Sequence, residues 1–220
     1  MVIKIISVLI LSYLIGAVPV GWIIVKLFTG RDVRVLGSGR IGGTNVMRAA
    51  GFVPGLLTSA MDIGKGVLAG IVSVWLVPDS MWLKFIGVTL AVVGQIFSVF
   101  LIEKREDGKF HLRGGAGGST TLGGAIALWP GSWIILLPLV AMVYVVVGYA
   151  SVTTISIAFF SLIVFAYRAI AGIGPWEYAL YGVLSLVIVI HALAPNIERL
   201  KAGTERVVGL RAYFLKKKAS

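Results

Sequence analysis

The sequence of 220 residues contains no cysteine and only two histidines, His111 and His191. Disulfides, thiolate nucleophiles and cysteine-ligated metals are therefore excluded. A histidine-rich metal cluster is not expected either, so we predict no metal and no cofactor. Acidic residues are scarce: nine Asp and Glu stand against 20 Lys and Arg, which gives a net charge of +11. Charged residues make up only 13% of the chain and hydrophobic residues 58%, well above the half-apolar composition of soluble domains.

Long hydrophobic runs account for most of the chain. They can be placed at about 3–28, 53–77, 82–102, 116–130, 132–148, 152–170 and 176–194. A run of about 20 apolar residues crosses a bilayer core of ~30 Å. The predicted fold is therefore all-α: a polytopic membrane protein of about seven transmembrane helices. We expect a helical domain over 1–195, with cytoplasmic loops at 30–52 and 103–116, followed by a basic cytoplasmic tail at 196–220.

The basic residues gather in those two loops and the tail, whereas the turns near Pro78, Pro130 and Gly174 carry no Lys or Arg. Cytoplasmic segments of membrane proteins carry the excess of Lys and Arg. We therefore predict an N-terminus outside and a C-terminus in the cytoplasm. The same distribution favours anionic lipid headgroups as partners and argues against nucleic acid. The oligomeric state is left open.

Two glycine-dense polar loops interrupt the apolar pattern, at Gly37–Asn45 and at Arg113–Gly124. Glycine allows positive φ and leaves backbone N–H groups accessible, which is what a loop around a phosphate needs. Gly37-x-Gly39-x-x-Gly42 matches a dinucleotide fingerprint only formally, because a membrane helix precedes it where a strand is required. Since both loops lie on the predicted cytoplasmic side next to hydroxyls and arginines, we predict an anion site there. Tight turns or close helix packing are the alternative.

Asp62 and Lys65 are ionisable residues inside the second hydrophobic segment, and their spacing puts them on one face of a helix. Ionisable residues within membrane helices pair with one another or face a polar cavity. Lys65 is therefore either a substrate contact or half of a structural ion pair.

These features together resemble the bacterial family of acyl-phosphate-dependent glycerol-3-phosphate acyltransferases. The resemblance covers nearly the whole chain. It rests on Gly37-Ser-Gly39, Ile41-Gly42, Thr44-Asn45 and Arg48, on Asp62 and Lys65-Gly66, on Gly114-Gly-x-Gly117 with Thr120, and on Asn196-Ile-x-Arg-Leu200 with Gly203-Thr-Glu205.

The resemblance implies an enzyme of phospholipid synthesis in the bacterial inner membrane. Such an enzyme moves a fatty acyl group from acyl-phosphate to glycerol-3-phosphate and forms lysophosphatidic acid. Ser38 and Asn196 are the candidate catalytic residues. The candidate substrate-binding residues are Gly37, Gly39, Thr44, Asn45, Arg48, Lys65, Arg113, Gly114, Gly115, Gly117 and Thr120.

The chain also departs from the family pattern. Ala116 stands where the second loop usually has lysine, and Leu193 and Ala194 stand where the third motif usually has histidine and arginine. Arg40 and Gln95 replace the usual asparagine and histidine. A divergent acyltransferase is the favoured interpretation. Arg40, Arg113 and His191 are the candidate replacement cations, and Arg113 is expected first because it is the nearest to Ala116. The alternatives are a non-catalytic paralogue that binds lipid or sugar phosphates and, less favoured, a small transporter of phosphorylated solutes.

Overall fold

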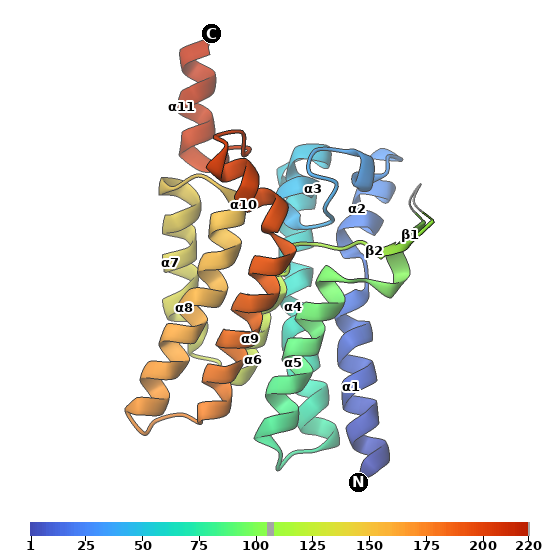
Figure 1. Cartoon of the computed structure of the whole chain (residues 1–220), viewed down its shortest axis with the longest axis vertical. Helices are drawn as coiled ribbons and strands as arrows, with labels where there is room; N and C mark the ends of the chain where they lie inside the picture. The colour runs from blue at the N-terminus through green and yellow to red at the C-terminus, as the bar shows by residue number, and fades with distance from the viewer. Residues whose placement is uncertain (105–107, 220) are drawn as a thin grey trace. The chain divides into compact units, whose positions relative to one another are not determined.

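The computed structural model describes residues 1–104 and 108–219, and the chain divides into two compact units, Met1–Trp129 and Pro130–Ser220. The first unit holds most of the elements that position the two glycine loops. In chain order these are α1 (Val2–Ala17), α2 (Val20–Thr29), the 3-10 turn η1 (Val33–Val35), α3 (Gly43–Ala50), α4 (Phe52–Leu76), α5 (Met81–Ile96), the 3-10 turn η2 (Val99–Leu101), β1 (Ile102–Lys104), β2 (Phe110–Leu112) and α6 (Gly118–Leu128) (Figure 1).

The first hydrophobic segment is an interrupted helix rather than a continuous one. Pro19 lacks a backbone N–H and cannot continue a helix, so α1 ends at Ala17 and α2 begins at Val20. The break leaves the carbonyl of Gly16 without its helical partner, and the carbonyl of Val18 accepts instead from the N–H of Val20 at 2.9 Å. The ammonium group of Lys65 on α4 donates to both, at 3.2 and 2.9 Å. The break and the buried lysine therefore satisfy each other.

Close helix packing uses several of the glycines outside the loops. A Cβ at Gly16 would lie 2.0 Å from the carbonyl oxygen of Ala91, and one at Gly94 would lie 2.2 Å from that of Tyr13, so α1 and α5 meet backbone to backbone. At the α4–α6 contact, a Cβ at Gly66 would lie 2.4 Å from the carbonyl oxygen of Thr120. Small residues at such contacts are the usual means by which membrane helices approach closely.

Under the first glycine loop lies a compact apolar cluster of buried residues: Val20, Ile24, Val25, Val33, Ile41, Val46 and Leu101. They come from α2, η1, the loop, α3 and η2. Each Å² of apolar surface that this cluster removes from water stabilises the fold by about 25 cal/mol. The cluster therefore holds the loop against the end of the helix bundle.

The second unit is wholly helical: α7 (Ser132–Val146), α8 (Ala150–Ile170), α9 (Trp176–Ala192), α10 (Ala194–Lys201) and α11 (Gly209–Ala219). In Figure 1, α8 and α9 run side by side and are joined by a short turn. α9 and α10 meet at an angle of 65°.

The structure leaves one prediction of the fold unconfirmed and departs from two others. The described residues contain four helices long and apolar enough to cross a membrane, or five if the bent pair α9–α10 is one span, so the count of about seven is not confirmed. The predicted span at 116–130 is only the 11-residue helix α6, which rises ~16 Å. The antiparallel hairpin of β1 and β2, with Glu103 opposite His111, is a small departure from the predicted all-α fold.

Candidate active site

Asn45 organises the first glycine loop. Its side-chain oxygen accepts from the backbone N–H of Ser38 at 2.9 Å, and its amide group donates to the carbonyls of Leu36 at 3.0 Å and Arg40 at 2.8 Å. The loop can close around this side chain because Gly37 and Gly39 have positive φ, 56° and 70°. Asn45, a predicted substrate contact, is thus buried and engaged by the loop backbone.

The other predicted residues of this loop are more accessible. Gly37 is exposed, and Ser38 and Thr44 are half-buried. The Ser38 hydroxyl forms no hydrogen bond within the described part of the chain. Arg48 is exposed on α3, three residues after Asn45. The loop therefore presents one hydroxyl and one guanidinium outward while Asn45 holds its shape.

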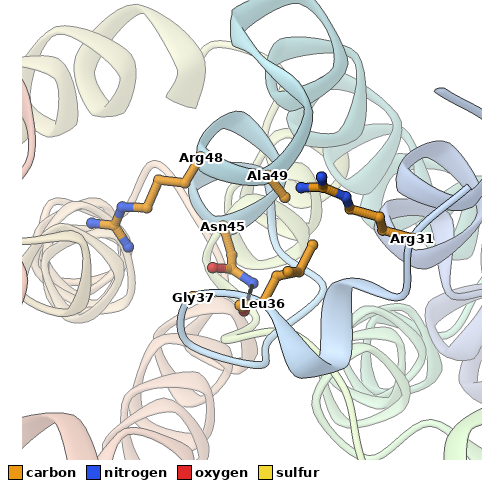
Figure 2. A pocket seen from close by; sticks show the side chains of 6 residues that line it. All are labelled: Arg31, Leu36, Gly37, Asn45, Arg48 and Ala49. Atoms are coloured by element: carbon orange, nitrogen blue, oxygen red, sulfur yellow. Dashed lines mark hydrogen bonds between the residues drawn. The ribbon is translucent and has the colours of Figure 1, made fainter. Parts of the chain in front are cut away.

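A pocket of about 200 Å³ opens beside this loop and α3, lined by Arg31, Leu36, Gly37, Asn45, Arg48 and Ala49. Figure 2 shows the Asn45 side chain directed at the loop near Leu36 and Gly37. The side chains of Arg31 and Arg48 extend on different sides of it. The pocket thus lies between two cations.

The second glycine loop is fastened to the end of α5. The N–H of Gly115 donates to the carbonyl of Gln95 at 2.8 Å, and the N–H of Ser98 donates to the carbonyl of Arg113 at 3.1 Å. Gly114 must be glycine because a Cβ there would lie 2.3 Å from the carbonyl oxygens of both Gln95 and Ile96. Here glycine serves close packing, and the Gly115 amide is occupied.

The structure brings the two glycine loops together. The N–H of Ile41 donates to the carbonyl of Gly114 at 3.5 Å, and the guanidinium of Arg40 donates to the carbonyl of Gly115 at 3.4 Å. These contacts join positions more than 70 residues apart in the sequence. The prediction that both loops contribute to one site requires this proximity.

The N-terminus of α6 follows directly. Gly117 has φ of 84°, and its carbonyl accepts from the N–H and the hydroxyl of Thr121, at 2.8 and 2.9 Å. The amides of Gly118, Ser119 and Thr120 donate to no acceptor in the described part of the chain. The hydroxyl of Thr120 is fully buried and likewise has no partner there. Unpaired N–H groups and the helix dipole at such an end favour an anion.

Two of the arginines around the loops, Arg34 and Arg113, form ion pairs with carboxylates. Arg34 donates from Nη2 to Asp32 at 2.6 Å, and the hydrogen bonds and charge of that guanidinium hold the pKa of the Asp32 carboxyl well below its usual range, against a smaller opposing effect of burial. Arg113 forms an ion pair with Glu103 and also donates to the carbonyl of Arg34 at 3.2 Å. The cation expected to replace the missing lysine is therefore already partnered by a carboxylate.

A buried polar group lies beneath the second loop. Lys65 and Asp62 form an ion pair at 2.7 Å, and the side-chain amide of Gln95 donates to Asp62 at 2.9 Å and accepts from Lys65. All three are almost fully buried. Of the two interpretations of Lys65, these contacts favour the structural ion pair. Gln95, a lone amide in an apolar segment, was not singled out as a site residue, although that isolation was a usable signal.

The third motif lies in the second unit. Asn196 is buried on α10, and its amide donates to the carboxylate of Glu205 at 3.0 Å. Arg199 forms an ion pair with the same carboxylate at 3.2 Å. Leu193 is buried at the α9–α10 bend, and Ala194 is exposed. Glu205 was not predicted as a site residue, and its carboxylate holds the amide of Asn196.

Comparison with known proteins decides the family. A family model described as glycerol-3-phosphate acyltransferase matches residues 6–203, and the glycerol-3-phosphate acyltransferase 2 of Moorella thermoacetica is 32% identical over 93% of this chain and 97% of its own length. The chain belongs to the glycerol-3-phosphate acyltransferase family. The predicted family is confirmed.

Other members of the family agree. The glycerol-3-phosphate acyltransferase of Syntrophomonas wolfei is 34% identical over 90% of this chain and 94% of its own. The crystal structure of PlsY (YgiH), an integral membrane glycerol 3-phosphate acyltransferase in its glycerol 3-phosphate form, superposes with a TM-score of 0.80 at 26% identity, covering 96% of this chain and 98% of that one. Its lysophosphatidic acid form gives a TM-score of 0.78 at 25% identity, covering 93% and 95%.

Proposed function

We propose that this chain transfers a fatty acyl group from acyl-phosphate to glycerol-3-phosphate and releases lysophosphatidic acid and inorganic phosphate. Glycerol-3-phosphate acyltransferase activity in phospholipid synthesis follows from the family, and the chain is a multi-pass protein of the bacterial inner membrane. The finer proposals concern the donor, the residues and the topology. The observation that carries them is the meeting of the two glycine loops at the N-terminus of α6.

The first loop is proposed to receive glycerol-3-phosphate. Ser38 and Arg48 are its accessible polar groups, and the exposed Gly37 leaves the loop backbone open to a ligand. A guanidinium is suited to a phosphate, because its donors match two phosphate oxygens. Asn45, Gly39 and Thr44 then act mainly by holding the loop in shape. PlsY was crystallised with glycerol 3-phosphate, which supports this acceptor.

The second loop is proposed to receive the phosphate of the acyl donor. The amides of Gly118, Ser119 and Thr120, together with the unpartnered Thr120 hydroxyl, offer donors to an anion at the start of α6. Backbone donors of this kind do not depend on the lysine that Ala116 replaces. Apolar helices around the loop provide the environment for the acyl chain.

The chemistry needs little from the protein because the donor is already activated. The first hydroxyl oxygen of glycerol-3-phosphate attacks the acyl carbon and forms the ester bond. The bond from that carbon to the phosphate oxygen breaks, and its electron pair leaves with the phosphate. A phosphate oxygen accepts the hydroxyl proton, so hydrogen phosphate departs. Positioning the two substrates and neutralising charge supply the acceleration. Ser38 is proposed to orient the acceptor hydroxyl, and Asn196 stays a candidate catalytic residue by the family resemblance.

We propose seven crossings with an N-terminus outside and a C-terminus in the cytoplasm, the helical domain over 1–195 and the basic tail over 196–220. The distribution of Lys and Arg supports this arrangement. The tail then faces anionic headgroups, to which each surface Lys or Arg contributes about 1 kcal/mol.

The test is an acylation assay on the purified protein with palmitoyl-phosphate and radiolabelled glycerol-3-phosphate. A panel of other polyol phosphates is offered as alternative acceptors. Labelled lysophosphatidic acid formed only in the presence of acyl-phosphate supports the proposal. Binding of acyl-phosphate without any acylation of any acceptor would instead indicate the non-catalytic paralogue.

A further inference from the structure

Arg40 crosses from the first glycine loop to the second. Its guanidinium Nη1 donates to the carbonyl of Gly115 at 3.4 Å, and its own backbone carbonyl accepts from the Asn45 amide at 2.8 Å. The neighbouring N–H of Ile41 donates to the carbonyl of Gly114. The Arg40 backbone is thus held by Asn45 and its guanidinium by the second loop, with the charge beside the peptide that joins Gly115 to Ala116.

The second loop has little charge of its own. From Gly114 to Leu128 the sequence contains no ionisable side chain. Arg113, immediately before the loop, forms an ion pair with Glu103 and donates to the carbonyl of Arg34. An anion at the start of α6 would therefore meet uncharged amides and hydroxyls from the second loop itself. Any positive charge that neutralises this anion therefore comes from another segment.

We infer that Arg40 is the cation that binds the phosphate of the acyl donor at the second loop. This inference rests on the proposed function and adds the residue that the donor phosphate contacts. As the bond between the acyl carbon and the phosphate oxygen breaks, the electron pair stays on that oxygen and its negative charge increases. A guanidinium beside the Gly115–Ala116 peptide neutralises that charge. Arg40 thereby helps both to bind the donor and to release phosphate.

The competing interpretation is that Arg40 only ties the two loops together through the Gly115 carbonyl. A variant that returns the positive charge without restoring the hydrogen bond to Gly115 distinguishes the two interpretations. Arg40→Gln removes the charge. Ala116→Lys, added to it, returns a positive charge to the second loop at a half-buried position but cannot rebuild the contact between loops. Lys26→Gln is the matched control, because it removes a nearby exposed cation whose ammonium donates to the carbonyl of Gly30.

Kinetics of the purified full chain are measured with each substrate varied in turn. Arg40→Gln is expected to lower kcat/KM for palmitoyl-phosphate by about tenfold or more, the effect of one lost charge-assisted hydrogen bond, with KM for glycerol-3-phosphate within about twofold. The Arg40→Gln, Ala116→Lys double variant is expected to recover most of the loss, and Lys26→Gln to behave as the native chain. Native kinetics in Arg40→Gln, or no recovery in a folded double variant, overturns the inference.

A second measurement uses the native chain and needs no turnover. Phenylglyoxal modifies accessible arginines, and mass spectrometry reports the fraction modified at Arg40. A non-transferable acyl-phosphonate is expected to slow modification of Arg40 severalfold, whereas decanol is not. Equal modification with and without the phosphonate overturns the inference. Protection in a chain that shows no acylation would uphold the role of Arg40 and refute the proposed activity, so the two failures are distinguishable.

Discussion

At the scale of single residues, the first loop separates groups that hold its shape from groups that face outward. Asn45 uses its oxygen and both amide hydrogens on the loop backbone. Replacing it with aspartate keeps the acceptor for the Ser38 N–H. The amide hydrogens that bind the carbonyls of Leu36 and Arg40 are lost, and a carboxylate oxygen takes their place. Each lost bond costs about 1 kcal/mol, and facing oxygens add repulsion. Asn45→Asp is therefore expected to lower the thermal unfolding temperature. Thr44→Ser, which keeps a hydroxyl at the next position, is the control.

Ser38 and Arg48 are expected to behave differently from Asn45. Because they lie at the accessible side of the loop, Ser38→Ala and Arg48→Ala should leave the unfolding temperature nearly unchanged. Each substitution should weaken the binding of glycerol-3-phosphate by about 1.5–3 kcal/mol where the partner is charged, and this loss is measured as a higher KM. Acylation at the native rate in both variants would show that the loop is purely structural.

The Asp32–Arg34 pair gives the loop a pH dependence. Arg34 holds the pKa of Asp32 well below its unfolded value of 3.8. A depressed carboxyl pKa stabilises the folded state above the unfolded pKa, and that contribution is lost as the pH falls below it. The protection factor of the η1 backbone amides, which is the intrinsic exchange rate at each pH divided by the observed rate, is therefore expected to fall below about pH 4 in the native chain. In Asp32→Asn the protection factor should be lower already at pH 7 and depend less on acid.

The sequence was informative about which segments meet and less so about what each residue does. The two glycine-rich loops between apolar segments were predicted to share one site, and Ile41 and Arg40 of the first loop contact Gly114 and Gly115 of the second. The roles of Asn45 and Lys65 were not predictable, because a polar side chain that binds substrate and one that saturates backbone carbonyls look the same in a sequence. Likewise, the partner of Arg113 is Glu103, ten positions earlier, and only the β1–β2 hairpin brings them together.

At the scale of helices, the contact of α4 with α6 sets the position of the second loop. A Cβ at Gly66 would lie 2.4 Å from the carbonyl oxygen of Thr120 and 2.5 Å from the backbone nitrogen of Gly124, so neither neighbour can yield as a flexible side chain would. Gly66→Ala is expected to displace α6, lower the unfolding temperature and depress acylation more than tenfold.

Gly64 on the same helix is the matched control. A Cβ there would meet nothing within 4 Å. Gly64→Ala is therefore expected to be neutral or to stabilise by up to about 1 kcal/mol, since alanine is the better helix former. Equal unfolding temperatures for Gly64→Ala and Gly66→Ala would contradict the packing role assigned to Gly66.

Hydrophobic runs located the helices well but not their breaks. Length and apolarity predicted α4, α5, α8 and α9 because periodic burial over 16 residues or more leaves a strong pattern. The interruption at Pro19 was missed because the apolar run continues across it in the sequence. The carbonyls at the break are satisfied by Lys65, which lies on a different helix. The length of α6 was overestimated because the glycines of the loop before it and the glycines inside it look alike in the sequence, so the start of the helix could not be located.

At the scale of the whole molecule, orientation in the membrane depends on whether the number of crossings is odd. α6 and α7 are short, rising ~16 and ~22 Å against a core of ~30 Å. If both cross a locally thinned bilayer, the chain crosses seven times. If the two together form a re-entrant pair, it crosses five times. Both numbers are odd, so in both cases the basic loops and the tail share one face and the termini lie on opposite faces. Only a single failed crossing would put the two termini on the same side.

Reporter fusions measure this parity directly. A fluorescent protein that matures only in the cytoplasm is expected to be bright at the C-terminus and dark when inserted in the Pro78–Ser80 turn, and alkaline phosphatase should give the opposite pattern. The turn serves as the internal control because α4 and α5, the helices on either side of it, are both long enough to span. Alkaline phosphatase that is active both at the C-terminus and in the turn would mean that one of the helices α6 and α7 crosses the membrane and the other does not. The tail would then face away from the glycine loops, and its cations would have no part in attracting the anionic substrates that the loops bind.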